Sequence, residues 1–360
     1  MTSALQSLVQ CGTKLYLDSV HPDEVDKNLA WGAVGATSNP AIISAIVDQG
    51  GMNDVIESLL SDAEHQHDDE AIAWEVTDRL VRAAQAKFQP IHQSTDGNAG
   101  WVSFELEPLL EDPKGLSGDG TALSDSERAA AYIKLGKRWA AGHTNRMIKV
   151  PATEAGIMAL EELAAAGITL NVTLIFTADQ YRRARNAVWR GAQRLPNTDR
   201  FKSVYSIFVS RIDVYTQQHL PNLSPDAQGM VGILNAKRIW AENNQFWSDK
   251  GLKLEQELIF ASTGVKDPSL PAWKYVEALA GSDIQTNPPE TNQAVADSDV
   301  TFSRTVDQMP SQTIQDEIDS AVDVDHLHQT LMSEGVAKFV KPQRALLEVV
   351  RKQRRSIATS

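Results

Sequence analysis

Short apolar segments alternate with longer helical patterns along most of this chain, and the alternation constrains the fold more than any other feature. Eight segments have the length and apolar content of strands, namely residues 14–18, 35–38, 101–106, 147–150, 168–175, 203–206, 258–262 and 283–286. Between several of them, apolar residues recur at helical spacing, over residues 71–88, 126–141, 154–166 and 178–193. Gly142 and Gly167 follow two of these patterns, at positions where helices commonly end.

A strand and a helix repeated about eight times over 360 residues predict an α/β fold, a (β/α)8 TIM barrel. The alternative is an open, doubly wound sheet, but the sequence contains neither a Gly-x-Gly-x-x-Gly turn nor a Walker loop. We therefore expect one barrel domain over residues 1–360, with a loop insertion at about residues 108–125. From about Thr313 onward, a mainly helical pattern predicts a C-terminal extension.

The composition disfavours several classes of protein. The net charge of −13 and the hydrophobic fraction of 42% favour a globular protein without a general surface for nucleic acid or anionic membranes. The first residues do not resemble a secretory leader, and no apolar run approaches the roughly 20 residues that span a membrane. We therefore expect a cytoplasmic protein that binds neither nucleic acid nor a membrane.

Two features that could carry other chemistry are interpreted as structural. The single cysteine, Cys11, precedes the first strand without a nearby histidine, which favours an ordinary thiol over a nucleophile. His65, His67 and Asp68 belong to a ligand-rich cluster inside a very polar stretch, which favours a solvated loop over a metal site. We expect no metal ion.

Polar residues stand at or just beyond the carboxyl ends of the predicted strands, where a barrel builds its active site. In chain order they are Asp18, Asn39, Glu105, Lys149, Asn171, Thr173, Ser206, Arg211, Ser262 and Lys266. Several interrupt otherwise apolar segments, which packing of a barrel interior alone would not select. These side chains form the candidate site.

Lys149 is the most informative of them. It lies between Met147-Ile148 and Val150-Pro151, so its neighbours favour burial while its charge opposes it. Desolvation lowers the proton affinity of a buried, unpaired amine, and a neutral amine can attack a carbonyl carbon. The alternative is a lysine that buries its stem and extends its ammonium to solvent. The spacing alone leaves both interpretations open.

Several other candidates also have an ordinary structural interpretation. Asp18 and Glu105 could exchange protons near the amine, or Asp18 could cap the following helix and Glu105 could form a salt bridge. Asn39 precedes a proline, which fits a helix cap. Arg211 could bind a phosphate with its fork of donors, or it could pair with Asp213.

Seven segments, taken together, resemble those of the transaldolase family, and the pattern is closer to its long bacterial form. They are LYLDSV, GATSNPAII, WVSFELEP, MIKVPATEAGIMAL, GITLNVTLIFTADQY, SVYSIFVSRID and LIFASTGVKDP. They follow the family's order from near the N-terminus to beyond residue 266, and the combination IKVPAT, NVTLIF and FVSRID is highly specific. The family fold is a (β/α)8 barrel, in agreement with the alternation of strands and helices.

The resemblance implies an enzyme of the non-oxidative pentose phosphate pathway that transfers a dihydroxyacetone unit between sugar phosphates, without a metal or an organic cofactor. Lys149 would form a Schiff base with the C2 carbonyl of fructose 6-phosphate or sedoheptulose 7-phosphate. Asp18 would take the proton whose loss accompanies carbon–carbon cleavage. Glu105 and Thr173 would position a water molecule that transfers protons.

The remaining implied contacts concern substrate binding. Asn39, Asn171 and Ser206 would hold the dihydroxyacetone fragment, and Phe208 would form an apolar boundary against water. Arg211 would bind the phosphate. The remaining candidates near that phosphate are Ser262 and Lys266, the cation nearest to the position where short members of the family carry an arginine. We expect a monomer or a homodimer.

Two other functions remain open. A fructose 6-phosphate aldolase would use the same chemistry but release free dihydroxyacetone. A barrel that binds sugar phosphates without turnover belongs to a different class, and the joint presence of Lys149, Asp18, Glu105 and Thr173 argues against it. The ratio of transfer to cleavage distinguishes a transaldolase from a fructose 6-phosphate aldolase.

Overall fold

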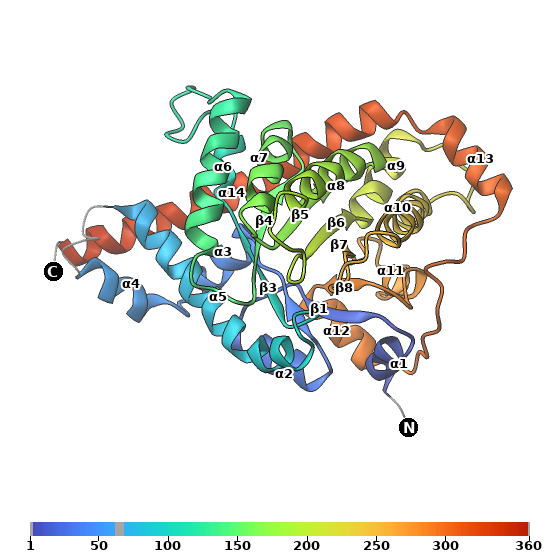
Figure 1. Cartoon of the computed structure of the whole chain (residues 1–360), viewed down its shortest axis with the longest axis horizontal. Coiled ribbons are helices and arrows are strands. Elements are labelled where there is room, and N and C mark those ends of the chain that lie inside the picture. The colour runs from blue at the N-terminus through green and yellow to red at the C-terminus, as the bar shows by residue number, and fades with distance from the viewer. Residues whose placement is uncertain (1–2, 62–67, 359–360) are drawn as a thin grey trace.

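Eight parallel strands close into a barrel in the computed structural model, which describes residues 3–61 and 68–358 (Figure 1). Each strand pairs with its neighbours in chain order, and β8 pairs with β1 to close the ring. The strands are β1 (Lys14–Leu17), β2 (Gly35–Ala36), β3 (Trp101–Glu105), β4 (Arg146–Pro151), β5 (Leu170–Ile175), β6 (Ser203–Phe208), β7 (Glu257–Ala261) and β8 (Ile284–Asn287). The predicted barrel is confirmed, its strand ends shift by at most two residues, and the open sheet is wrong.

Helices surround the barrel, as expected for parallel strands that need cover on their outer faces (Figure 1). Those that follow or precede the strands are α1 (Ala4–Gln10), α2 (Pro22–Ala30), α3 (Pro40–Asp48), α4 (Asn53–Leu60), α5 (Asp69–Ser94), α6 (Asp125–Ala140), α7 (Glu154–Ala165), α8 (Ala178–Ala192), α9 (Ser210–His219), α10 (Val231–Trp247), α11 (Lys274–Ala278) and α12 (Pro289–Ala296). The four predicted helices correspond to α5, α6, α7 and α8. None of the described helices is long and apolar enough to cross a membrane.

The strands lie in the centre of the core. Every residue of β3 to β8 is buried, because side chains inside the barrel pack on one another and those outside pack on helices. A polar side chain on such a strand has lost its hydration and needs a partner. Lys149 on β4 and Asn171 on β5 are in this position, with exposed fractions of 5% and 0%.

Residues 108–125 begin with a 3-10 turn, η1 (Pro108–Glu111), and continue as an irregular loop until α6 starts at Asp125. Ser124 caps α6 and forms a capping box with Glu127. Arg344 connects this loop to the end of the chain, since its guanidinium pairs with Asp112 at 2.6 Å and donates to the Gly115 carbonyl.

The predicted C-terminal helical extension is confirmed as α13 (Gln312–Ala321) and α14 (Val324–Ala358). Figure 1 shows α14, in red, running along much of the length of the molecule. It packs against α3, α4, α5, α9 and η1. Arg351 and Arg354, near its basic end, pair with Asp69 of α5, so these charges are partly used within the chain.

Two features interpreted as structural have simple surroundings. Cys11 is partly buried at the end of α1, and its Sγ lies 3.0 Å from the Leu8 carbonyl. Within the proposed ligand cluster, Asp68 caps α5 through the Ala71 amide, while His65 and His67 lie outside the described residues.

Candidate active site

A cavity of about 540 Å³ opens at the carboxyl ends of the barrel strands. Nine of the eleven predicted site residues line it, namely Asp18, Asn39, Lys149, Thr173, Ser206, Phe208, Arg211, Ser262 and Lys266. The other two, Glu105 and Asn171, contact members of this set from the strands themselves. A cavity of this size suits a small phosphorylated ligand.

Lys149 lies at the centre of the arrangement because of the strand register. Glu105 of β3 pairs with Lys149 of β4, which pairs with Asn171 of β5, so the three residues share one level of the barrel. The Lys149 ammonium lies 3.1 Å from Glu105 Oε2 and donates to the Ser38 carbonyl at 3.1 Å. The Phe339 ring, 5.6 Å away, covers it from α14. The alternative of a lysine that extends to solvent is therefore wrong.

Glu105 is as buried as the lysine, with an exposed fraction of 6%. Burial raises the pKa of its carboxyl group, and the neighbouring Lys149 ammonium counteracts the effect. The expected alternative, a salt bridge, is present, but it joins Glu105 to the candidate amine. A carboxyl group with a raised pKa beside an amine can exchange a proton with it.

Asp18 follows β1 and accepts a hydrogen bond from Thr37 Oγ1 at 2.8 Å. Its carboxylate borders the cavity, but protein atoms surround it closely enough that desolvation raises its pKa, against the influence of Lys149. Asp18 does not cap the following helix, since α2 begins after His21 without a side-chain cap. The aspartate is therefore free to act on a molecule in the cavity.

Asn171 and Ser206 form one hydrogen-bonded set across the barrel. Ser206 Oγ donates to Asn171 Oδ1 at 2.7 Å, and Asn171 Nδ2 donates to Ser103 Oγ at 2.9 Å. These bonds fix the orientation of the asparagine amide. Asn39, by contrast, caps α3 by accepting from the Ile42 amide at 3.1 Å, and it also lines the cavity.

Thr173 lies at an irregularity in β5. The register between β5 and β6 shifts between Val172 and Ile175, and Leu174 has a positive φ of 58°. A bulge of this kind re-aims the neighbouring side chain at a local conformational cost. Thr173 Oγ1 is buried and, among the described residues, has no hydrogen-bond partner. A buried hydroxyl of this kind needs a polar partner in the cavity.

Arg211 extends from α9 to the same cavity, and its guanidinium lies 5.1 Å from the centre of the Phe208 ring. Asp213, its proposed alternative partner, instead pairs with Lys274 at 3.5 Å and accepts a hydrogen bond from Tyr275. Arg211 Nη1 is buried and has no hydrogen-bond partner within the described part of the chain. This donor is available to an anion.

Several residues of the cavity could not be assigned from strand ends alone. Thr37 and Thr286 connect to Asp18, since their hydroxyl oxygens lie 2.6 Å apart and Thr37 donates to the carboxylate. Three other residues, Glu334, Lys338 and Phe339, come from α14. Thr37 lies in the GATSNP segment, so this motif could have indicated that Thr37 belongs to the site. No motif in the sequence of α14 indicated that its three residues do.

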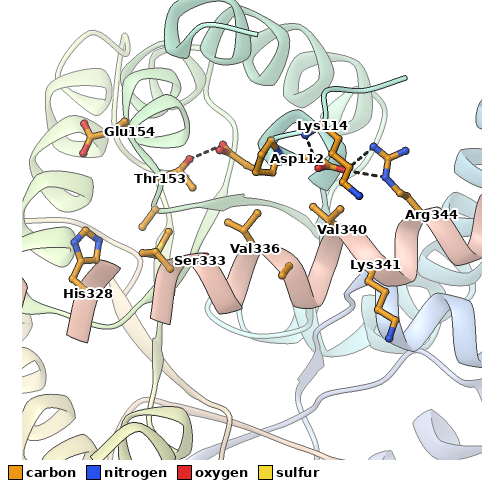
Figure 2. A pocket seen from close by; sticks show the side chains of 15 residues that line it. Asp112, Lys114, Thr153, Glu154, His328, Ser333, Val336, Val340, Lys341 and Arg344 are labelled. Carbon is orange, nitrogen blue, oxygen red and sulfur yellow. Dashed lines mark hydrogen bonds and ion pairs between the residues drawn. The ribbon is translucent and has the colours of Figure 1, made fainter. Parts of the chain in front are cut away.

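A second, larger groove of about 650 Å³ lies along another side of α14. Figure 2 shows Val336 and Val340 directed toward the loop that carries Asp112 and Lys114. Its residues differ from those that α14 contributes to the barrel cavity. The helix therefore forms part of the wall of both spaces. Among the described residues, no group of three or more His, Cys, Asp or Glu side chains is arranged to hold a metal ion.

The fold and the cavity together define a class: a (β/α)8 barrel with a buried lysine, paired with a carboxylate, at the carboxyl ends of its strands. A family model described as transaldolase/fructose-6-phosphate aldolase matches residues 15–350. The chain therefore belongs to the transaldolase/fructose-6-phosphate aldolase family, a family of enzymes, as the sequence motifs predicted.

Curated relatives agree with this assignment over nearly their full lengths. A transaldolase of Thermobifida fusca is 31% identical, over 98% of this chain and 99% of the relative. A protein named transaldolase 2, of Streptomyces avermitilis, is 32% identical over 100% of both chains. A transaldolase of Saccharopolyspora erythraea is 33% identical over 98% of both.

Proposed function

We propose that the protein is a transaldolase, which transfers a dihydroxyacetone unit from a ketose phosphate to an aldose phosphate. The donor is sedoheptulose 7-phosphate or fructose 6-phosphate, and the acceptor is glyceraldehyde 3-phosphate or erythrose 4-phosphate, in the non-oxidative pentose phosphate pathway. One observation carries the proposal: a buried Lys149 ammonium, 3.1 Å from Glu105, borders a cavity that also contains Asp18 and Arg211. A carbonyl compound that reaches this amine can form an imine.

The first step joins Lys149 to the donor. Its Nζ, after losing a proton to Glu105 directly or through water, adds to the C2 carbonyl carbon. The resulting carbinolamine loses its hydroxyl group as water and becomes a protonated imine. Glu105 and Thr173 position the water that moves these protons, which is consistent with the buried, unpaired Thr173 hydroxyl and the adjacent carboxyl group.

The second step breaks the C3–C4 bond. Asp18 takes the proton of the C4 hydroxyl group, the aldehyde forms at C4, and the bonding electrons move to C3 and onward to the imine nitrogen. The product on Lys149 is an enamine of dihydroxyacetone. An arriving aldose phosphate reverses the sequence, since the enamine carbon attacks its aldehyde and Asp18 returns the proton. Water then hydrolyses the new imine, which releases the ketose phosphate and restores the amine of Lys149. The raised pKa of Asp18 favours both roles.

The remaining site residues hold the fragment and the phosphate. Asn39, Asn171 and Ser206 bind the dihydroxyacetone hydroxyl groups, supported by the amide orientation that Ser206 and Ser103 fix. Phe208, with an exposed fraction of 7%, limits access of water to the enamine.

Arg211 binds the phosphate through the guanidinium edge that has no hydrogen-bond partner among the described residues. Ser262 and Lys266, which line the same cavity, assist it.

The proposed chemistry uses no metal or organic cofactor, because the protonated imine itself accepts the electrons of the broken bond. We place the reaction in the cytoplasm, in a monomer or a homodimer whose whole chain forms one catalytic domain. The net charge of −13 supports the absence of a nucleic-acid partner.

The experiment that tests this function compares transfer with cleavage. The protein is incubated with fructose 6-phosphate, with and without erythrose 4-phosphate, and the products are quantified by mass spectrometry. A transaldolase forms sedoheptulose 7-phosphate and glyceraldehyde 3-phosphate when the acceptor is present, with little free dihydroxyacetone. Free dihydroxyacetone as the main product would assign an aldolase. Substrate binding without any product would assign a non-catalytic barrel.

A further inference from the structure

Three cationic side chains from distant parts of the sequence line the barrel cavity close to one another. Arg211 comes from α9, Lys266 from the segment after β7, and Lys338 from α14. Within the described residues, none of the three forms a salt bridge with a carboxylate. An unpaired group of three cations at one end of a cavity attracts a multiply charged anion.

The three cations also affect one another. Lys338 is largely exposed, but partial desolvation at the cavity, and then the positive charges of Arg211 and Lys266, lower its pKa, while Glu334 opposes them. Burial likewise lowers the pKa of Arg211, which Glu334 and Asp18 partly offset. Such mutual repulsion is unfavourable without a ligand, and a bound anion relieves it.

The position of α14 depends on a glycine. A Cβ atom on Gly335 would lie 3.1 Å from the Leu174 side chain and 3.5 Å from Arg211 Nη1. The absence of a side chain therefore lets the helix backbone approach the guanidinium closely. Glu334 and Lys338, one turn apart on this helix, are held at the mouth of the cavity by this contact.

From this arrangement we infer that Lys338 of α14 is a substrate-binding residue that contacts the phosphate of the sugar, together with Arg211 and Lys266. The inference rests on the proposed function and adds a specificity element to it. A phosphate ester carries nearly two negative charges at neutral pH, and three cations match it better than one arginine. The C-terminal helix thereby selects phosphorylated over unphosphorylated sugars.

The same helix offers a matched control. Lys341, three residues after Lys338, is exposed as Lys338 is, but it lines the outer groove instead of the barrel cavity (Figure 2). Lys338→Met and Lys341→Met remove the same side-chain charge from the same helix. A general change in the electric field of the protein affects both variants, whereas a direct phosphate contact affects only the first.

The experiment measures three quantities in the full-length wild type and in both variants. They are the KM and kcat for fructose 6-phosphate, the inhibition constant of inorganic phosphate, and the yield of the borohydride-trapped adduct with free dihydroxyacetone. For Lys338→Met we expect the KM and the inhibition constant to rise about 10-fold, because the phosphate loses one charge-assisted hydrogen bond. The kcat and the dihydroxyacetone adduct should change little, because neither depends on phosphate binding.

Further comparisons decide the outcome. Lys338→Arg should restore most of the affinity for inorganic phosphate, and Lys341→Met should equal the wild type. Equal inhibition constants in Lys338→Met and Lys341→Met would overturn the inference while leaving the proposed function intact. Failure of the wild type to form any adduct with dihydroxyacetone or fructose 6-phosphate would instead remove the proposed function itself.

Discussion

The two ends of the barrel each contain a buried lysine, and their surroundings differ. At the amino ends of the strands, Lys202 donates to the Glu255 carbonyl at 2.7 Å and to the Glu257 carboxylate at 2.6 Å. Its side chain has no exposed surface. At the carboxyl ends, Lys149 donates to one carbonyl, pairs with one carboxylate, and also borders a cavity.

This comparison shows that burial of a lysine does not by itself indicate chemistry. Lys202 belongs to an ion-pair cluster with Lys14, Glu255 and Glu257, and its ammonium has no access to the barrel cavity. A buried pair of this kind contributes to a unique fold and costs stability when it is broken. Lys149 differs because its own side chain lines a cavity, together with Asp18 and Thr173, whereas Lys202 does not line the cavity that its partners Glu255 and Glu257 border. Access to a cavity, and not burial, marks the carboxyl ends of the strands as the reactive end.

The same substitution at the two lysines provides the largest expected contrast. Lys149→Met should reduce kcat by about 10⁴-fold or more, because no other group can form the imine. Lys202→Met should leave the kcat of the folded protein nearly unchanged but reduce the free energy of unfolding by about 3 kcal/mol, since it leaves Glu257 without its closest partner. Steady-state kinetics and urea unfolding measure the two effects. A fall in kcat of similar size in both variants would contradict the distinction between a reactive Lys149 and a structural Lys202.

Two aspartates with raised pKa values extend the comparison. Asp18 at the cavity has a pKa raised by burial, and it must be ionised to accept the proton of the C4 hydroxyl group. Activity should therefore fall as the pH decreases through a value above the usual aspartate range. Asp18→Asn should lower kcat by about 10²–10⁴-fold and abolish this acid limb in the pH profile of the residual activity. An unchanged acid limb in the variant would assign the titration to another group.

Asp283, at the amino end of β8, should affect stability only. Burial and the charge of Glu257 raise its pKa from 3.8 to about 6. The folded protein therefore binds this proton more tightly than the unfolded chain does, and the contribution of Asp283 to stability is lost as the pH rises from about 4 to about 6. The difference in unfolding free energy between the wild type and Asp283→Asn should decrease by about 3 kcal/mol over that range. A kcat of Asp283→Asn that differs from the wild-type value would contradict the assignment of Asp283 to stability alone.

The smallest expected effect concerns the cover that α14 provides at the reactive end. Gly335→Ala should raise the KM for fructose 6-phosphate about 3-fold, since the new Cβ displaces the helix from Arg211 and Leu174. Alanine favours a helix by up to about 1 kcal/mol over glycine, so the free energy of unfolding should change little. Kinetics together with thermal unfolding check both. A large loss of stability without a change in KM would indicate a purely structural role.

Much of the reactive end could be predicted from the sequence, because a parallel barrel turns strand order into spatial order. Once Glu105, Lys149 and Asn171 are placed on consecutive strands, the register brings them to one level. The burial of Lys149 could not be decided in the same way. It depends on Phe339, which lies 190 residues later in a helix whose pattern indicates an apolar face but not the surface it covers.

The contribution of α14 illustrates what sequence patterns leave out. Lys338 and Glu334 resemble solvated charges on an exposed helix face, and only the packing of α14 against α3, α5 and α9 brings them to the cavity. The bulge at Leu174 is similar, since its positive φ contradicts the local preference of leucine and depends on the surrounding barrel. Tertiary contacts, and not local propensity, fix both features.

The most direct test of the account is to trap the covalent intermediate. The protein is incubated with fructose 6-phosphate, reduced with borohydride, digested, and mapped by peptide mass spectrometry. The account predicts an added mass of dihydroxyacetone size on the peptide that contains Lys149, and none on the peptide that contains Lys202. An adduct on Lys202 or another lysine, or no adduct in folded protein that binds the substrate, would contradict the assignment of Lys149 as the imine-forming residue.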